Sequence, residues 1–206
     1  DAIIDVFAMD LCDSMPENPP ITHETKTKFV IEIFCGHAGI SSACNERGVA
    51  AVAVDWVGNK HKVAFPVKKL DLTSPPDLQV LWAVLNEDGL AMVWLAPPCG
   101  TFSRAREKPL PTWAAEAGAP RPVPLRDAAH PGGFPGLDGA SLEKVREGNA
   151  LANLTAQIGR FCIEQNIAFA VGNPHRSWIW HMPELHMLAS NAACHEVYFH
   201  NCAFGS

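Results

Sequence analysis

The sequence lacks the features that mark several common protein classes. None of its seven cysteines stands in a CxxC pair, and their number is odd. No apolar run approaches the roughly 20 residues that span a bilayer, and no signal-peptide pattern is present. The net charge of −6 gives no global field that attracts nucleic acid. We therefore expect reduced thiols, an intracellular location and no membrane partner, and we exclude a disulfide framework.

The composition is that of one domain with a sizeable core. The chain has 206 residues, of which 48% are hydrophobic. Residues 1–27 are interpreted as a leader and linker because "PENPPITHETKT" has linker composition, and the domain proper is expected over 28–206. Since the chain begins with Asp1 and stops just after an apparent strand, we expect it to be a piece of a longer protein.

Apolar runs alternate with helical patterns along the chain. Strands are predicted at 28–34, 49–55, 67–73, 90–96, 167–172 and 195–202. Helices are predicted at 39–48, 74–89 and 141–166. Residues 104–139 are rich in proline and glycine and are predicted to lack regular structure. Unbroken apolar strands separated by helices indicate an α/β fold, a doubly wound, mostly parallel sheet, which binds ligands outside the carboxyl ends of its strands.

The first three predicted strands end in residues that suit a nucleotide-like ligand. "FCGHAGIS" places Gly36 and Gly39 where a helix begins, although the spacing is GxxG and not GxGxxG. Asp55 suits the hydroxyls of a ribose and Trp56 suits an adenine face. The alternatives are a solvated carboxylate and a partly buried ring. Asp71 suits an exocyclic amine or, more simply, caps a turn or helix.

The fourth predicted strand leads into "APPCGTFSRAR", which places a cysteine at the start of a loop. Pro97 and Pro98 stiffen the exit from the strand, and Cys99 follows them. Nearby Arg104 and Arg106 favour a thiolate, which can attack an electron-poor carbon. These arginines either contact phosphate or belong to a solvated loop. The other cysteines that fit the usual buried role are Cys35, Cys44 and Cys162.

Together these segments resemble the cytosine-5 DNA methyltransferases. "EIFCGHAGIS", "VDW", "LDL", "APPCGTFSRAR" and "VGNPHRSW" follow the order of that family over about residues 28–202, and the PPCxxFS segment is the most specific part. The resemblance implies a Rossmann-like methyltransferase fold with S-adenosylmethionine as cofactor and DNA as partner. It also implies a nuclear location if the protein is eukaryotic and a cytoplasmic one otherwise.

The resemblance implies a role for each matching residue. Cys99 would add to carbon 6 of a cytosine flipped from the duplex, so that carbon 5 takes the methyl group. The segment 104–139 would close over the flipped base. The implied cofactor-binding residues are Phe34, Gly36, Gly39, Asp55, Trp56, Asp71 and Pro97. The implied substrate-binding residues are Ser103, Arg104, Asn173 and Pro174.

The chain departs from the family in two ways. The family has Glu-Asn-Pro where this chain has Gly172, Asn173 and Pro174. That glutamate holds the cytosine edge and assists its protonation, and a positioned acid contributes roughly 10²–10⁴-fold in rate, so we expect impaired activity. The nearest acids in sequence are Glu164 and Glu184. The family's target-recognition region and final helix have no match in this chain. The stretches "NPHRSWIW" and "NCAFGS" resemble the methyltransferase-like domains of mobile elements and phages more than maintenance enzymes.

Two other interpretations remain open at this level. The first is a non-catalytic domain that binds S-adenosylmethionine or supports a larger polyprotein. The second is a metal site built from Cys194, His195, His200 and Cys202. Because these residues have no zinc-like spacing, we expect no metal.

Overall fold

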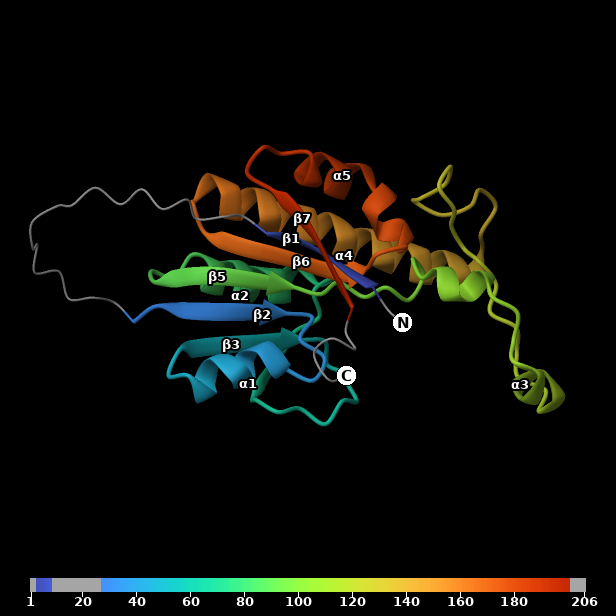
Figure 1. Cartoon of the computed structure of the whole chain (residues 1–206), viewed down its shortest axis with the longest axis horizontal. Coiled ribbons are helices and arrows are strands. Elements are labelled where there is room, and N and C mark those ends of the chain that lie inside the picture. Colours follow the sequence, from blue (N-terminus) through green and yellow to red (C-terminus); the bar gives the residue numbers. More distant parts are fainter. Residues whose placement is uncertain (1–2, 9–26, 201–206) are drawn as a thin grey trace, which may run out of the picture.

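A seven-stranded sheet forms the centre of the protein. The computed structural model describes residues 3–8 and 27–200. The strands are β1 (Ile3–Ala8), β2 (Phe29–Ile33), β3 (Ala50–Asp55), β4 (Val67–Lys69), β5 (Leu90–Leu95), β6 (Ala168–Pro174) and β7 (His195–His200). Their order is β4-β3-β2-β5-β6-β1-β7 (Figure 1). The first five strands in this order are mutually parallel, and β1 runs antiparallel to both of its neighbours.

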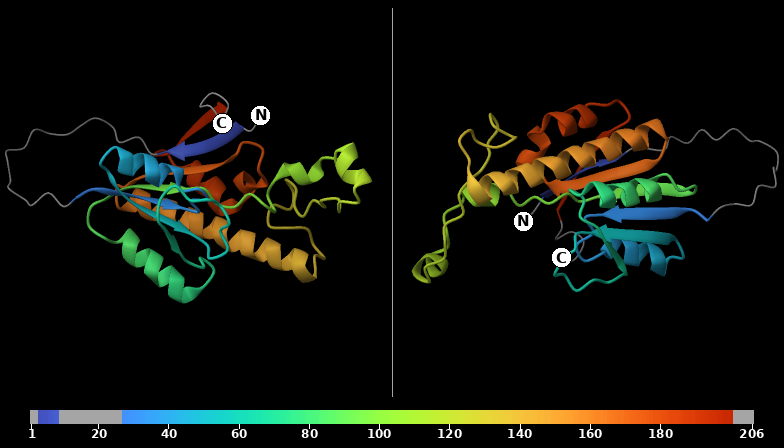
Figure 2. Two further views of the ribbon diagram at one scale, coloured as in Figure 1. Left: turned by 90° about the horizontal axis from the view of Figure 1, so that it is seen from below. Right: turned by 180° about the vertical axis from the view of Figure 1, so that it is seen from behind.

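Helices cover both faces of the sheet. They are α1 (Gly39–Glu46), α2 (Pro75–Leu85), α3 (Thr112–Glu116), α4 (Gly139–Glu164) and α5 (Pro183–Ala189), with 3-10 turns η1 (Arg104–Glu107) and η2 (Trp178–His181). Helix α1 lies on one face, and α2 and α4 lie on the other, where α5 packs on α4 (Figure 2). The predicted α/β class with a mostly parallel sheet is therefore confirmed.

The two faces of the sheet bury different side chains because side chains alternate along each strand. In β2, Ile31 and Ile33 are fully buried in the main core with α2, α4 and α5. Between them, Glu32 is 4% exposed and accepts hydrogen bonds of 2.7 Å from both the backbone N–H and the hydroxyl of Ser41 in α1. This buried carboxylate fixes the first turn of α1 to the sheet.

Several predicted boundaries differ from the structure. Strand β4 stops at Lys69, although the apolar pattern extends to residue 73, because the carboxylate of Asp71 accepts from the backbone of Thr73 and closes a turn. Helix α2 ends at Leu85, four residues before Gly89, which has φ of 97°.

The proline- and glycine-rich segment 104–139 is more ordered than predicted. It contains η1 and α3, and α4 begins at Gly139 after Asp138 and not at Ser141. Its coil is fixed by long-range side-chain hydrogen bonds, chiefly those of Arg126 to Thr101, Val145 and Asn149. Propensity and periodicity carry no information about such contacts.

The two ends of the described chain meet in the sheet. Residues 3–8, within the expected leader, form β1 between β6 and β7. The last predicted strand, 195–202, is observed as β7, and its final two residues lie outside the described residues, as do residues 9–26. Within the described part of the chain, no helix is both long and apolar enough to cross a bilayer.

The strand order reverses between β2 and β5. From β2 the chain moves outward to β3 and β4, then returns to the other side of β2 to form β5 and β6. In open α/β sheets, ligands bind at such a reversal, outside the carboxyl ends of the two central strands. Just past these ends, the backbone N–H of Ala96 donates to the carbonyl of Ile33 at 3.1 Å. The loops that contain Cys35 and Cys99 therefore leave the sheet side by side.

Candidate functional site

The turn after β2 is held in an unusual backbone conformation. Phe34, Gly36 and Ala38 all have positive φ, at 60°, 52° and 61°. For a residue with a side chain this left-handed conformation costs roughly 1–2 kcal/mol, so the surrounding contacts must impose it. The turn leads into α1, where Ala38 provides no side-chain cap and the carboxylate of Glu32 accepts from the backbone N–H of Ser41. Predicted cofactor residues Phe34, Gly36 and Gly39 thus lie at or next to the start of this helix.

Asp55 joins the turns that follow β2 and β3. Asp55 is 7% exposed, and its carboxylate accepts from the backbone N–H of Gly36 at 2.7 Å and of Trp56 at 2.8 Å. The amide of Asn59 donates both to this carboxylate at 2.9 Å and to the carbonyl of Gly36 at 2.7 Å. Asp55, which was predicted to bind a ribose, therefore already connects the two turns by hydrogen bonds. Its Oδ1 atom accepts only one of these bonds and so retains a lone pair for a hydroxyl group of a ligand.

Trp56 and Asp71, both predicted to contact adenine, differ in their surroundings. Trp56 is 58% exposed, and its ring lies against Gly58, where a Cβ would come within 2.5 Å of it. A large aromatic face is thus open at the end of β3. Asp71 is also exposed, but its Oδ1 accepts from the backbone and hydroxyl of Thr73 at 2.9 and 2.6 Å, which lowers the pKa of the carboxyl group. In the structure Asp71 therefore caps a turn.

The loop that carries Cys99 is fastened by three other segments. The carbonyl of Pro97 accepts from the side-chain amide of Asn173 at 2.7 Å. The carbonyl of Gly100 accepts from Arg106 at 2.9 Å, and that of Phe102 accepts from the backbone of Trp178 at 2.9 Å. Arg106, predicted either to bind phosphate or to be solvated, is instead a structural tie, since it also donates to the carbonyl of Val123 at 3.0 Å.

Cys99 itself is half-buried, and its thiol forms no hydrogen bond with any described residue. Two other thiols are in a different situation. Burial raises the pKa of Cys162 to about 12, and burial followed by the nearby charge of Asp55 raises the pKa of Cys35 to about 12. Both stay protonated at neutral pH, which makes them poor nucleophiles.

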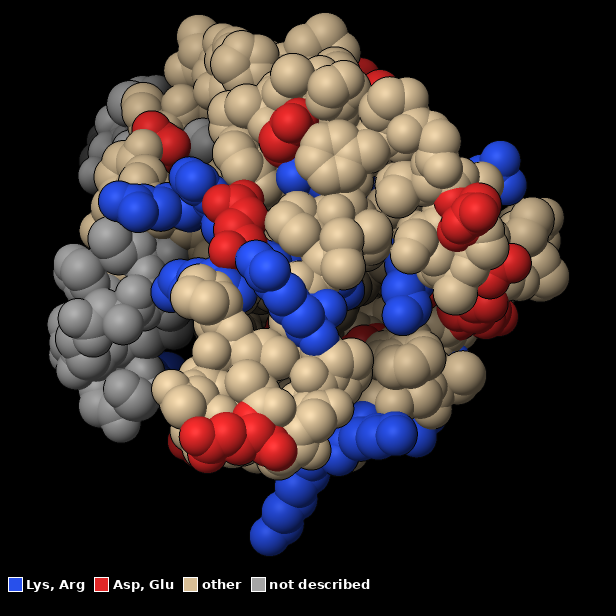
Figure 3. All heavy atoms as spheres, turned by 90° about the vertical axis from the view of Figure 1, so that its right-hand side faces the viewer, with Lys and Arg blue, Asp and Glu red and all other residues tan. Residues whose placement is uncertain are grey.

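A basic cleft of about 850 Å³ lies between η1 and the turn after β6. Predicted substrate residues Ser103, Arg104 and Pro174 line it, whereas Cys99 does not. Its cations come from Arg104, Lys108 and Arg176, and it also contains His175 and one carboxylate, that of Glu107. Figure 3 looks onto this side of the protein and shows Lys and Arg side chains around a hollow. Three cations against one carboxylate make the cleft locally positive on an acidic protein.

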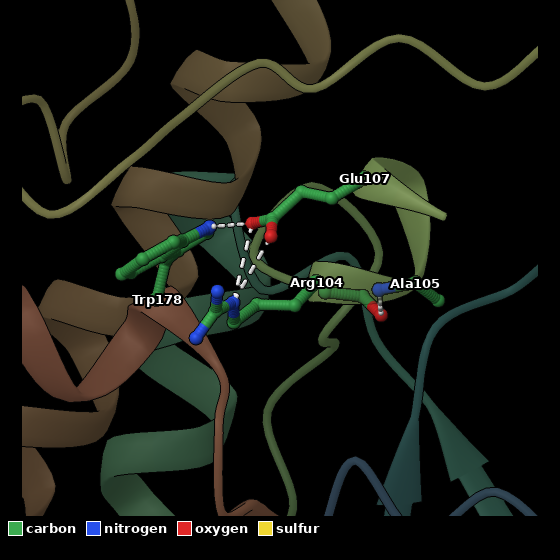
Figure 4. A network of polar contacts seen from close by, with 5 residues as sticks. Arg104, Ala105, Glu107 and Trp178 are labelled. Carbon is green, nitrogen blue, oxygen red and sulfur yellow. Dashed lines mark hydrogen bonds and ion pairs between the residues drawn. The ribbon is translucent and has the colours of Figure 1, made fainter. Parts of the chain in front are cut away.

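Within this cleft Arg104 is held by two neighbours (Figure 4). Its Nε lies 3.1 Å from the carboxylate of Glu107, and its guanidinium lies 4.7 Å above the ring of Trp178. The indole N–H of Trp178 donates to Glu107 at 2.9 Å. The hydroxyl of Ser103 accepts from the backbone of Ala105 and caps η1. Arg104 and Ser103, both predicted to bind substrate, thus have intramolecular partners. A ligand would have to displace these partners or bind alongside them.

The end of β6 contains Gly172, which departs from the family pattern, and Asn173, which matches it. Gly172 is buried in the strand, and Asn173 is 4% exposed. The Asn173 Oδ1 atom has no hydrogen-bond partner among the described residues. Neither Glu164, at the end of α4, nor Glu184, in the first turn of α5, lines the cleft. Its acidic residue is Glu107, which was not predicted because it lies in the segment expected to lack structure.

The described part of the chain contains no group of three His, Cys, Asp or Glu side chains that could hold a metal ion. Of the four residues considered for such a site, Cys202 lies outside the described residues, and the side chain of His200 is not described. Cys194 is half-buried, and burial raises its pKa.

Comparison with known proteins adds no relative. No protein-family model matches the chain, and searches of curated proteins and solved structures find no match. Arguments about function therefore rest on the residues and on their arrangement.

Proposed function

We propose that this domain transfers a methyl group to carbon 5 of a cytosine in DNA, with Cys99 as the nucleophile. The observation that carries the proposal is the position of Cys99. It lies on a fastened loop that follows β5, where the strand order reverses, and this loop leads to Ser103 in the locally basic cleft. Phosphate contacts supply most of the affinity of a protein for nucleic acid, and such a cleft provides them even where net charge does not.

The residues at the carboxyl ends of β2 and β3 fit S-adenosylmethionine. Trp56 offers an open aromatic face for the adenine, and Asp55 offers a carboxylate oxygen with spare accepting capacity. At the start of α1, the backbone N–H groups of Gly39 and Ile40 suit the carboxylate of the methionine part, whereas that of Ser41 donates to Glu32. When bound, S-adenosylmethionine supplies an electrophilic methyl group.

The chemistry assigned to Cys99 is covalent catalysis. Its thiolate would form a bond to carbon 6 of the cytosine and shift the C5–C6 π electrons to carbon 5. Carbon 5 would then bond to the methyl group as the bond from that methyl to the sulfonium sulfur breaks, which leaves S-adenosylhomocysteine. Loss of the carbon 5 proton to a base expels the thiolate and restores the ring. The cytosine must leave the stack for the sulfur to reach carbon 6.

Gly172 limits the rate in this proposal. It has no side chain with which to hold the cytosine edge, and Glu107 is engaged with Arg104 and Trp178. A missing positioned acid costs roughly 10²–10⁴-fold. This absence favours the second candidate function, a non-catalytic domain that binds S-adenosylmethionine or supports a larger polyprotein.

The test measures transfer of a labelled methyl group from S-adenosylmethionine to a DNA oligonucleotide. The control oligonucleotide carries 5-methylcytosine at every cytosine. The proposal predicts label only in the first oligonucleotide, and more of it with Gly172→Glu. If folded wild-type protein and Gly172→Glu both bind S-adenosylmethionine but label neither, the non-catalytic function is favoured.

A further inference from the structure

Arg126 is a fully buried cation that has no acidic partner among the described residues. It is 1% exposed, and its guanidinium lies 3.8 Å over the ring of Phe102. Burial lowers its pKa to about 10, so it is still charged at neutral pH. Placing a charge in the interior without a counter-ion is costly. The hydrogen bonds of its guanidinium must therefore offset this cost.

All five N–H groups of this guanidinium donate hydrogen bonds. Nε and Nη2 donate to the hydroxyl of Thr101 at 3.1 and 2.9 Å. Nη1 donates to the carbonyl of Pro131 and to the side chain of Asn149, both at 2.6 Å. Nη2 also donates to the carbonyl of Val145 at 3.0 Å. One side chain thus joins the Cys99 loop, the segment 104–139 and helix α4.

A glycine in α4 leaves room for the contact between Arg126 and Thr101. At Gly148 in α4, a Cβ would lie 2.9 Å from the hydroxyl of Thr101 and 3.0 Å from Nη2 of Arg126. The missing side chain lets the loop and the guanidinium approach the helix. Asn149, which accepts from Arg126, also donates to the carbonyl of Gly132 at 2.9 Å. The guanidinium is therefore the centre of a saturated network.

Thr101 and Phe102 follow Cys99 by two and three residues. The other ties of this loop reach backbone carbonyls of Pro97, Gly100 and Phe102. Arg126 holds the loop by side chains, through the Thr101 hydroxyl and the Phe102 ring. We infer that Arg126 is a positioning residue that fixes the Cys99 loop through Thr101 and Phe102. Its effect on catalysis rests on the proposed function, whereas its effect on the loop does not.

The test compares Arg126→Met with Thr101→Val, which removes the accepting hydroxyl at nearly constant shape. Arg121→Met is the matched control, because Arg121 is an exposed arginine of the same segment. Alkylation by iodoacetamide is followed at each cysteine by peptide mass spectrometry, and amide hydrogen exchange is followed in the peptide that contains residues 100–103. Buried Cys162 reports on global unfolding.

We expect Arg126→Met and Thr101→Val to speed exchange of residues 100–103 and alkylation of Cys99 by about tenfold or more. In both variants the alkylation rate of Cys162 should stay near that of wild type. In the control Arg121→Met, the exchange of residues 100–103 and the alkylation of Cys99 should also stay near wild type. Arg126→Lys should restore only part of the loop protection, because its ammonium lacks the fork of donors. Equal rises at Cys99 and Cys162 would indicate a merely stabilising role and overturn the inference, as would an unchanged loop in Thr101→Val.

Methyl transfer separates this inference from the proposed function. If wild type transfers methyl groups, both loop variants should slow transfer by about 10²-fold, with unchanged affinity for S-adenosylmethionine in calorimetric titration. If wild type transfers none but the loop responds as expected, Arg126 still positions Cys99 and the proposed function fails. Normal transfer rates in both variants would overturn the assigned effect on catalysis.

Discussion

Cys35 and Cys99 follow neighbouring parallel strands at the same edge of the sheet, yet their surroundings differ. Cys35 is 7% exposed and its sulfur lies 3.9 Å from the carboxylate of Asp55, so burial and negative charge keep it protonated. Cys99 is half-buried, on a loop that other segments hold and that leads to Ser103 in the basic cleft. Position at the edge of the sheet therefore does not by itself make a thiol a nucleophile, because burial and the charge of Asp55 keep Cys35 protonated.

The largest expected effect comes from replacing the sulfur of Cys99 by oxygen, and the same replacement at Cys35 should have a small effect. Cys99→Ser should reduce methyl transfer by about 10³-fold or more, since a hydroxyl is a far weaker nucleophile. Cys35→Ser should retain most of the activity, because its hydroxyl can keep the contact with Asp55. The labelled-methyl assay measures both. Equal losses in the two variants would contradict the contrast.

Removal of the Asp55 carboxylate should change both the affinity for S-adenosylmethionine and the pKa of Cys35. Asp55→Ala should weaken S-adenosylmethionine binding by about 1–3 kcal/mol, as measured by calorimetric titration. It should also lower the pKa of Cys35, because the Asp55 charge is one of the causes that raise it. The pH dependence of Cys35 alkylation measures this second effect. An unchanged affinity would remove Asp55 from the cofactor site.

The protonated thiols predict a loss of stability in alkali. Cys35 and Cys162 have pKa values of about 12 in the folded protein, against an ordinary value of 9.0. Between these values the folded protein holds protons that the unfolded chain releases, so the free energy of unfolding falls as pH rises from 9 towards 12. Urea titrations should show a shallower fall in Cys35→Ser and in Cys162→Ala. A slope identical to that of wild type in both variants would contradict the assignment.

The smallest expected effect concerns the cleft. Arg176→Ala should weaken binding of a DNA oligonucleotide a few-fold and reduce the salt slope by up to about 0.9. Arg160→Ala is the control, because Arg160 is exposed on α4 and does not line the cleft. Fluorescence anisotropy over a range of salt concentrations measures both. Equal effects of the two substitutions would indicate general electrostatics and not a site.

The sequence predicted the parts of the fold that depend on local patterns. The parallel strands, the two longer helices and the strand-end positions of Asp55 and Cys99 follow from apolar periodicity and chain order. The early end of β4 was missed because the apolar pattern of Leu70 and Leu72, which are buried, continues through a turn closed by Asp71. Burial and strand geometry are separate properties, and an apolar pattern reports only the first.

The residues that complete the candidate site were less accessible to sequence reasoning. Glu107 and Arg126 lie in a segment without periodicity, and their importance comes from partners distant in sequence, such as Trp178 and Thr101. Arg106 was predicted from its charge alone either to bind phosphate or to be solvated, whereas it fastens two carbonyls. Charge and spacing identify candidate residues, but only tertiary contacts separate a binding residue from a structural one.

The central claim is that Cys99 is the nucleophile. Its most direct test is to incubate the protein and S-adenosylmethionine with an oligonucleotide that contains 5-fluorocytosine, a cytosine analogue that blocks elimination, and to locate any covalent adduct by peptide mass spectrometry. The account predicts an adduct on the peptide that contains Cys99, slow in wild type and faster in Gly172→Glu. An adduct on another cysteine, or none in either folded protein, would contradict it.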